Sequence, residues 1–173
     1  MNFRYFLGSF VAIGLMLASV GAIAQDSPSR PKVASLLVLK SDRKMIAYDA
    51  AGKEIETYRF SLGKSPTGPK QEAGDQKTPE GKYFINAHNK SSSYFLSLRI
   101  SYPDEADVKR AKKQGVDPGG AIFIHGQPNR NGWNWQKYSV GRDWTNGCIS
   151  VTNGDMKELW DTVEDGTPIE IRP

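Results

Sequence analysis

The segment Val33–Leu62, VASLLVLKSDRKMIAYDAAGKEIETYRFSL, decides the class of fold. It contains three stretches rich in β-branched, aliphatic and aromatic residues, which favour strands, at 33–40, 43–49 and 54–62. In the third stretch Tyr58, Phe60 and Leu62 alternate with polar residues, which is the period of a half-buried strand. Short Ser-Asp and Ala-Gly turns separate the stretches, so we predict a β-meander.

Outward from this segment, further strand patterns lie at 82–87, 94–102, 121–124 and 169–172. A polar helix is predicted over 104–114, capped by Asp104 and stopped by Gly115. A second helix, capped by Thr152 or Asn153, carries an apolar stripe made of Met156, Leu159, Trp160 and Val163. We therefore expect one mainly β domain with two or three short helices.

The size and charge of the chain exclude several classes of protein. Its 173 residues fit one domain. The formal charge of +4 is small and no dense Lys/Arg stripe is present, so nucleic-acid binding is not expected. With one cysteine, an internal disulfide framework is impossible.

The first residues have the layout of an export signal. Arg4 precedes an apolar run at 6–18, and Ala22-Ile23-Ala24 matches the small-x-small cleavage pattern. The run is shorter than the ~20 residues of a membrane span. We predict a signal peptide at 1–24, a polar linker at 25–34 and a domain at 35–173. The protein would then be exported to the periplasm or cell wall with no membrane span after cleavage; an uncleaved anchor is the alternative.

The chemistry concentrates at Cys148, in the sequence DWTNGCIS at 143–150. A lone thiol is unusual in an exported protein, although a small buried hydrophobe is the simpler interpretation. Gly147 lets the backbone approach a ligand, and successive amides at such a turn can form an oxyanion hole. His125 ends the apolar run IFIHG at 122–126, where it could act as a base for the thiol. One Cys and two scattered His, with no paired-ligand motif, predict no metal site, and no cofactor is expected.

These motifs together resemble a known family. His125-Gly126, an interval of 18 residues and then TNGCI at 145–149 resemble the signature of the L,D-transpeptidase catalytic domain (YkuD-type), and GDQKTPEG at 74–81 is similar to its GD-x-x-TP-x-G segment. The resemblance runs from about Leu36 to Ile171. It implies a β-sandwich-like fold and a substrate in the bacterial cell wall, namely peptidoglycan stem peptides.

The resemblance also implies roles for individual residues. Cys148 would be the nucleophile, His125 its general base, and the backbone carbonyl of Gly126 would orient the imidazole. The backbone N–H groups of Asn146, Gly147 and Cys148 would hold the oxyanion. The thiolate would attack the L-centre carbonyl of a stem tetrapeptide, releasing D-alanine and leaving a thioester for an amine or water to resolve.

One departure leaves the acceptor open. Many family members carry Arg two residues after the cysteine, where it is thought to help place the substrate; this chain has Ser150 there, which is a candidate substrate contact. With SLRISYP at 97–103, this resembles the YafK-like murein subgroup, some of whose members are hydrolases that release a wall-linked lipoprotein. Arg142 is a candidate replacement cation, or else a solvated loop residue. A non-catalytic wall-binding module is the remaining alternative.

Other candidate substrate contacts surround these motifs. Thr145 matches the Ser/Thr position of the signature and can support the site by hydrogen bonding. The aromatic segment 127–144 contains Trp144 together with Trp133, Trp135 and Tyr138, and either caps the cleft or anchors its own loop. Tyr94 is a further candidate, whereas His88 is interpreted as a surface or strand-end histidine.

Overall fold

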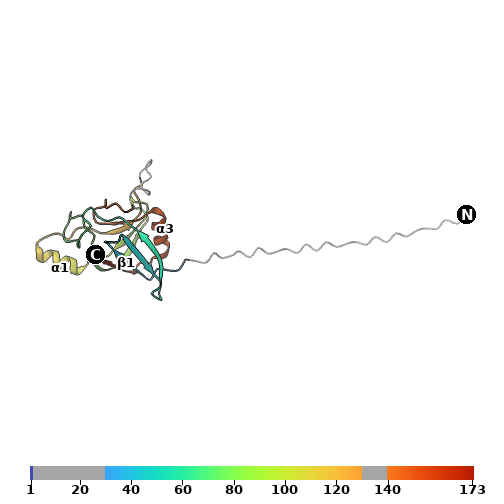
Figure 1. The fold of residues 1–173 in the computed structure, drawn as a ribbon, viewed down its shortest axis with the longest axis horizontal. Coiled ribbons are helices and arrows are strands. Elements are labelled where there is room, and N and C mark those ends of the chain that lie inside the picture. The colour runs from blue at the N-terminus through green and yellow to red at the C-terminus, as the bar shows by residue number, and fades with distance from the viewer. Residues whose placement is uncertain (2–29, 130–139) are drawn as a thin grey trace.

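The computed structural model describes residue 1 and the ranges 30–129 and 140–173 (Figure 1). Its centre is an eight-stranded sheet with the order β3-β2-β1-β8-β4-β5-β6-β7. The strands are β1 (Ser35–Leu39), β2 (Lys44–Tyr48), β3 (Glu54–Arg59), β4 (Gly81–Asn89), β5 (Ser97–Ile100), β6 (Phe123–His125), β7 (Ile149–Ser150) and β8 (Pro168–Arg172).

The predicted meander is confirmed, because β1, β2 and β3 pair in turn as antiparallel neighbours. The last strand, β8, returns to lie parallel to β1, with Leu36 opposite Ile169. Two strands depart from the prediction. The pattern at 94–102 yields only the short β5, and the two-residue β7 has no periodicity from which it could be recognised.

The sheet is curled, and β4 makes the bend. Residues 81–84 of β4 pair with β8, while residues from Ile85 onward pair with β5 across a register shift between Ile85 and Ala87. The two ends of the sheet then meet: Ser61, just after β3, exchanges backbone hydrogen bonds of 2.8 and 2.9 Å with Ser150 of β7. The result is the mainly β fold that was expected, with its core enclosed by the curl.

The core begins before the predicted domain boundary. Val33 is buried and forms a bridge with Val163, although 25–34 was predicted to be a linker. The inner face of the sheet buries apolar side chains from every part of the chain, including Val38, Phe60, Ile124 and Ile171. Burial of this apolar surface is the main driving force for the fold.

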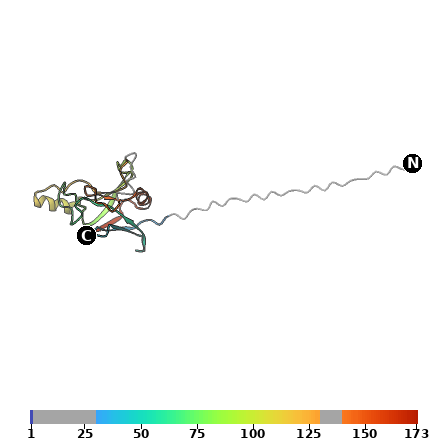
Figure 2. The same cartoon turned by 45° about the horizontal axis from the view of Figure 1, so that its top comes forward.

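The two helices of the described residues, α1 (Glu105–Gln114) and α3 (Asn153–Thr162), lie at opposite ends of the part of the fold drawn in colour (Figures 1 and 2). In α1, Asp104 and Asp107 form a capping box and Gly115 closes the helix in the left-handed conformation, as predicted. In α3, Thr152 is the N-cap. Met156 and Leu159 of the predicted stripe are fully buried.

Several predicted features fall outside the described residues: the signal peptide apart from residue 1, the linker up to residue 29, and Trp133, Trp135 and Tyr138. Within the ranges that are described, no helix has the length and apolar character needed to cross a membrane.

Candidate active site

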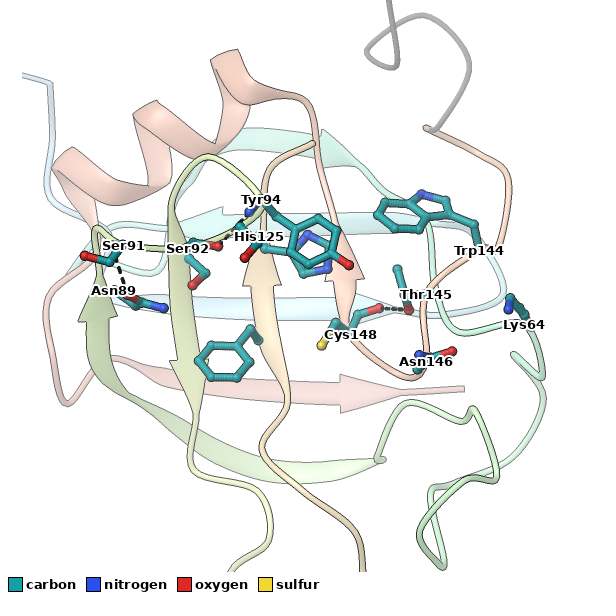
Figure 3. Close-up of a pocket in the computed structure, with 13 residues that line it drawn as sticks. Lys64, Asn89, Ser91, Ser92, Tyr94, His125, Trp144, Thr145, Asn146 and Cys148 are labelled. Carbon is teal, nitrogen blue, oxygen red and sulfur yellow. Dashed lines mark hydrogen bonds between the residues drawn. The ribbon is translucent and has the colours of Figure 1, made fainter. Parts of the chain in front are cut away.

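A pocket of about 470 Å³ is lined by both Cys148 and His125, the predicted nucleophile and base (Figure 3). His125 ends β6, and Cys148 directly precedes β7, which pairs parallel to β6 with His125 opposite Ser150. Phe123, two residues before His125, lines the same pocket, because alternate residues of a strand face one side. The pairing of two short strands therefore sets the separation of the imidazole and the thiol.

The imidazole of His125 is held in one tautomer. Its Nδ1 lies 2.7 Å from the carbonyl oxygen of Gly126, which can only accept, so Nδ1 carries the proton. Nε2 has no hydrogen-bond partner among the described residues and is the nitrogen available as a base. Burial lowers the pKa of His125 and outweighs the opposing effect of the Gly126 hydrogen bond. The ring is therefore neutral near pH 7.

Gly126 is fixed by the start of α3. A Cβ at Gly126 would lie 2.6 Å from Oδ1 of Asn153 and 3.0 Å from Cβ of Phe95. The same Asn153 oxygen accepts a hydrogen bond of 2.7 Å from the backbone N–H of Gln127. Only glycine fits this contact, and it places the carbonyl that orients His125.

Aromatic rings flank the imidazole on two sides. The ring centroid of Tyr94 lies 4.6 Å from that of His125, and the centroid of Trp144 lies 5.7 Å from it. Tyr94 and Trp144 both line the pocket, and Tyr94 lies in front of His125 in Figure 3. These rings limit the motion of the imidazole and exclude water from it, which explains its burial.

The environment of Cys148 favours the neutral thiol over the thiolate. Burial raises its pKa, while a hydrogen bond with the backbone of Phe123 and the positive charge of Lys70 lower it in part. Although Cys148 and His125 share the pocket, no hydrogen bond joins their side chains in the described structure. The resting pair is thus a neutral thiol and a neutral imidazole, and attack requires proton transfer between them.

The turn 145–148 is held by Thr145. Its hydroxyl donates to the carbonyl oxygen of Cys148 at 2.7 Å and accepts from the N–H of Gly147 at 3.1 Å. This corrects one expectation, because the Gly147 N–H is already engaged and is not available to an oxyanion. No described residue accepts from the N–H of Asn146 or Cys148, so these two amides remain as candidates.

The segment 74–81 contacts this turn and stabilises it. Thr78 Oγ1 donates to the carbonyl oxygen of Gly147 at 2.8 Å. Gly147 has φ +125°, and a Cβ there would lie 2.6 Å from the carbonyl oxygen of Lys77. Asp75 in turn holds the segment by accepting from the N–H groups of Gln71 and Lys77. From the sequence alone, 74–81 was recognised only as part of a family signature, and its contacts with the turn 145–148 follow from the fold.

Two predicted substrate contacts do not reach the pocket. Ser150 is fully buried: its hydroxyl accepts from Nε2 of Gln127 at 3.2 Å and donates to the carbonyl oxygen of Gly126 at 3.4 Å. Because burial excludes Ser150 from direct substrate contact, its role lies in supporting Gly126. Arg142 is exposed and is not among the residues that line the pocket.

One ion pair near the site was not predicted from the sequence, and His88 lies away from the site. Asp143 pairs with Arg43, from Nε to Oδ1 at 3.0 Å, and its Oδ1 also accepts from the N–H of Leu62. His88 binds Asp165 and the carbonyl oxygen of Val163 at the far end of β4. Nothing in the local sequence marked the Arg43–Asp143 pair, because its members are 100 positions apart.

No group of three His, Cys, Asp or Glu side chains within the described ranges could hold a metal ion. The described pocket lining offers a thiol and a neutral imidazole, with Lys64, Tyr94 and other polar side chains beside them.

Comparison with known proteins finds two relatives that are similar over most of this chain. YafK of Escherichia coli K12, named as a candidate L,D-transpeptidase, is 29% identical over 131 residues, which cover 73% of this chain and 45% of YafK. The helical cell shape determining protein Pgp2 from Campylobacter jejuni is 26% identical, with a TM-score of 0.62, covering 82% of this chain and 48% of Pgp2. This chain thus spans less than half the length of either relative.

A third likeness concerns the fold alone. The L,D-transpeptidase (residues 123–326) from Xylanimonas cellulosilytica is 17% identical with a TM-score of 0.52, covering 84% of this chain and 63% of that one. The model of the YkuD family, described as the L,D-transpeptidase catalytic domain, matches residues 34–171, which is nearly all of the described fold. The chain therefore belongs to the L,D-transpeptidase catalytic domain (YkuD) family.

Proposed function

We propose that this protein is an exported, cysteine-dependent enzyme of peptidoglycan that transfers the acyl group of a stem tetrapeptide through a thioester on Cys148. The observation that carries the proposal is the hydrogen bond from His125 Nδ1 to Gly126, which leaves Nε2 as a base in the pocket that Cys148 lines. Export rests on the signal-like residues 1–24, and the wall substrate on membership of the family.

The proposed reaction has two steps. His125 Nε2 takes the proton of the Cys148 thiol, and Sγ forms a bond to the L-centre carbonyl carbon of the stem peptide. The carbonyl oxygen becomes an oxyanion at the N–H groups of Asn146 and Cys148. When the C–N bond breaks, the imidazolium returns its proton to the amine of the departing D-alanine. An incoming nucleophile then gives its proton to Nε2 and releases Cys148.

Hydrolysis is the second candidate, in which water resolves the thioester. It includes an L,D-carboxypeptidase and an amidase that releases wall-linked lipoprotein; transfer to an amine would instead give a cross-link or a lipoprotein attachment. This candidate rests on Ser150, which stands where many family members carry Arg. An amine must attack as the free base, so the charge of the pocket lining does not choose between an amine and water.

The test is product analysis by mass spectrometry. Purified protein and its Cys148→Ala variant are incubated with tetrapeptide muropeptides and with sacculi that carry linked lipoprotein. Cross-linked dimers with free D-alanine identify the transpeptidase, whereas tripeptides or freed lipoprotein without dimers identify the hydrolase.

Turnover retained by a folded Cys148→Ala variant contradicts both candidates. Binding of the wild type to sacculi without any product favours the wall-binding module. The Cys148→Ala substitution removes only one sulfur atom, so its circular dichroism spectrum and melting temperature serve as the control for folding.

A further inference from the structure

A second pocket, of about 450 Å³, adjoins Cys148 and is lined by one charged side chain. It is distinct from the pocket drawn in Figure 3. Its described lining consists mainly of small residues from the segments 73–76 and 119–122, together with Lys70, Asn146 and Cys148. Asn146 and Cys148 line both pockets, so the pocket that contains His125 and the pocket that contains Lys70 meet at the turn 145–148.

Lys70 is fixed at this position by several contacts. Its side chain is 4% exposed, and its Nζ donates to Oδ1 of Asp75 at 2.8 Å and to the carbonyl oxygen of Glu72 at 3.0 Å. A Cβ on Gly119 would lie 2.9 Å from Cε of Lys70, so the lysine stem lies against the glycine backbone. Arg110 of α1 holds the backbone carbonyl of Lys70.

This burial is costly, because an ammonium group loses hydration that one carboxylate only partly replaces. Asp75 is not among the residues that line the pocket, whereas Lys70 is. The lysine of the ion pair therefore lines the same cavity as Cys148, whereas Asp75 accepts hydrogen bonds from the backbone amides of its own loop.

We propose that Lys70 is a positioning residue whose charge stabilises the thiolate of Cys148 when His125 takes its proton. The proposal rests on Cys148 being the nucleophile of the proposed function. The other titratable or charged side chains lining the two pockets are Lys64, Tyr94 and His125, and the segment before Cys148 carries Arg142 and Asp143. Asp143 is paired with Arg43. The charge of Lys70 acts to lower the pKa of a thiol that burial raises.

The test measures the thiol directly and needs no substrate, so it is separate from the test of the proposed function. The rate of Cys148 alkylation by iodoacetamide is followed against pH in wild type, Lys70→Met, Lys70→Arg and Asp75→Asn. Lys70→Met should raise the apparent pKa by about one unit and lower the rate below the pKa about tenfold. Lys70→Arg should remain near wild type. Lys109→Met, on the exposed face of α1, is the matched control and should change nothing.

The sign of the Asp75→Asn effect decides between charge and structure. Removing the carboxylate leaves the Lys70 charge uncompensated, so the thiol pKa should fall. If Lys70 only holds the loop together, both substitutions break the same ion pair and shift the profile in the same direction. That result, or the absence of any shift in either variant, overturns the proposal. If Lys70→Met does not fold, Asp75→Asn alone still gives the deciding direction.

Discussion

Thr145 shows how much of the site depends on a single hydroxyl group. Its Oγ1 bridges the N–H of Gly147 and the carbonyl oxygen of Cys148 within a buried turn. Both backbone groups are thereby satisfied, and no described residue accepts from the N–H groups of Asn146 and Cys148. The hydroxyl is thus a substitute for regular secondary structure at the point where the backbone must leave amides free.

Replacing Thr145 should reduce both stability and catalysis. Thr145→Val keeps the shape but leaves two buried backbone groups unpaired, at a cost of about 1–3 kcal/mol. If this cost falls on the oxyanion turn, kcat/KM should decrease about 10- to 100-fold. Thr145→Ser retains the hydroxyl and should recover most of the activity. An equal loss in both variants would mean that the methyl group, not the hydrogen bonds, matters.

The burial of His125 makes stability depend on pH. Its pKa is lowered in the folded state, so the unfolded chain binds more protons between the two pKa values. The contribution of neutral His125 to the free energy of unfolding is complete above about pH 6.5. It is lost as the pH falls from there through the pKa that His125 has in the folded protein. Urea unfolding between pH 7.5 and 5.5 should show a slope of up to about 1.4 kcal/mol per unit.

The His125→Gln variant should lack this slope, and His88→Gln should retain it. Asp75 affects the free energy of unfolding over a lower range of pH. Burial raises its pKa, but the stronger combined effect of hydrogen bonds from Lys70 and backbone amides keeps the pKa below its ordinary value. The stability that Asp75 contributes is therefore lost only below about pH 4. A slope that persists in His125→Gln would assign the acid sensitivity to another group.

At the level of elements, two irregular segments support each other. The loop between β3 and β4 contacts the turn 145–148 so closely that side chains are excluded. A Cβ on Gly63 would lie 1.9 Å from the carbonyl oxygen of Gln76 and 2.9 Å from the N of Gly147. Lys40, at the end of β1, adds a buried ammonium that donates to the carbonyl oxygens of Gly68 and Thr78. The precision of the site therefore comes from loop-to-loop packing.

Gly63→Ala should disrupt this packing although the substitution adds one methyl group. Displacing two backbone segments costs about 1–3 kcal/mol as overpacking, and the turn that carries Cys148 would shift with them. We expect a lower melting temperature and strongly reduced activity. Gly120→Ala is the matched control, because nothing lies within 4 Å of its added Cβ and its φ is not positive. Its unfolding free energy should stay within about 0.5 kcal/mol of wild type. Equal melting temperatures would contradict the contact.

The elements that the sequence predicted are those specified by local patterns. The meander 33–62 and both helices with their caps follow from periodicity and capping chemistry, which act over a few residues. The parallel pairing of β1 with β8 joins segments that are more than a hundred positions apart. The two-residue β7 depends on its pairing with neighbouring strands. No local pattern encodes them.

The same distinction applies to the site. His125 and Cys148 stood out because their motifs are local, and the structure places them in one pocket. Lys70, Asn153 and the Arg43–Asp143 pair act across the fold, so their roles could not be read from spacing. Ser150 was predicted as a substrate contact because its position in the motif is known, whereas its burial depends on the curl of the sheet.

At the scale of the whole molecule, the curled sheet needs closure. Its two edge strands, β3 and β7, are joined by the backbone bonds of Ser61 and Ser150. Next to this seam, which is the pairing of Ser61 with Ser150, Arg43 from the turn between β1 and β2 pairs with Asp143, which precedes the turn 145–148. The side chains of Arg43 and Asp143 are only 21% and 18% exposed. The pair therefore links the turn between β1 and β2 to the segment that carries Trp144 and Cys148.

Breaking this ion pair should loosen the seam and the site together. Arg43→Met leaves Asp143 half-buried without its cation, while Asp143→Asn also weakens the hydrogen bond from Leu62. Each single variant should lose about 1–3 kcal/mol of unfolding free energy, because an unpaired charge remains. In the double variant the loss should be smaller than the sum, with a coupling energy of about 0.5–3 kcal/mol.

A double-mutant cycle by urea unfolding measures this coupling, and kcat/KM measured on the same four proteins shows whether the catalytic turn moves with the seam. Arg172→Met, which breaks an exposed ion pair with Glu170, is the matched control and should have little effect on either quantity. Additive losses of stability would mean that Arg43 and Asp143 act separately. Coupled stability with unchanged kcat/KM would mean that the seam closes the sheet without positioning Cys148, because the loop 63–80 then suffices to hold the turn.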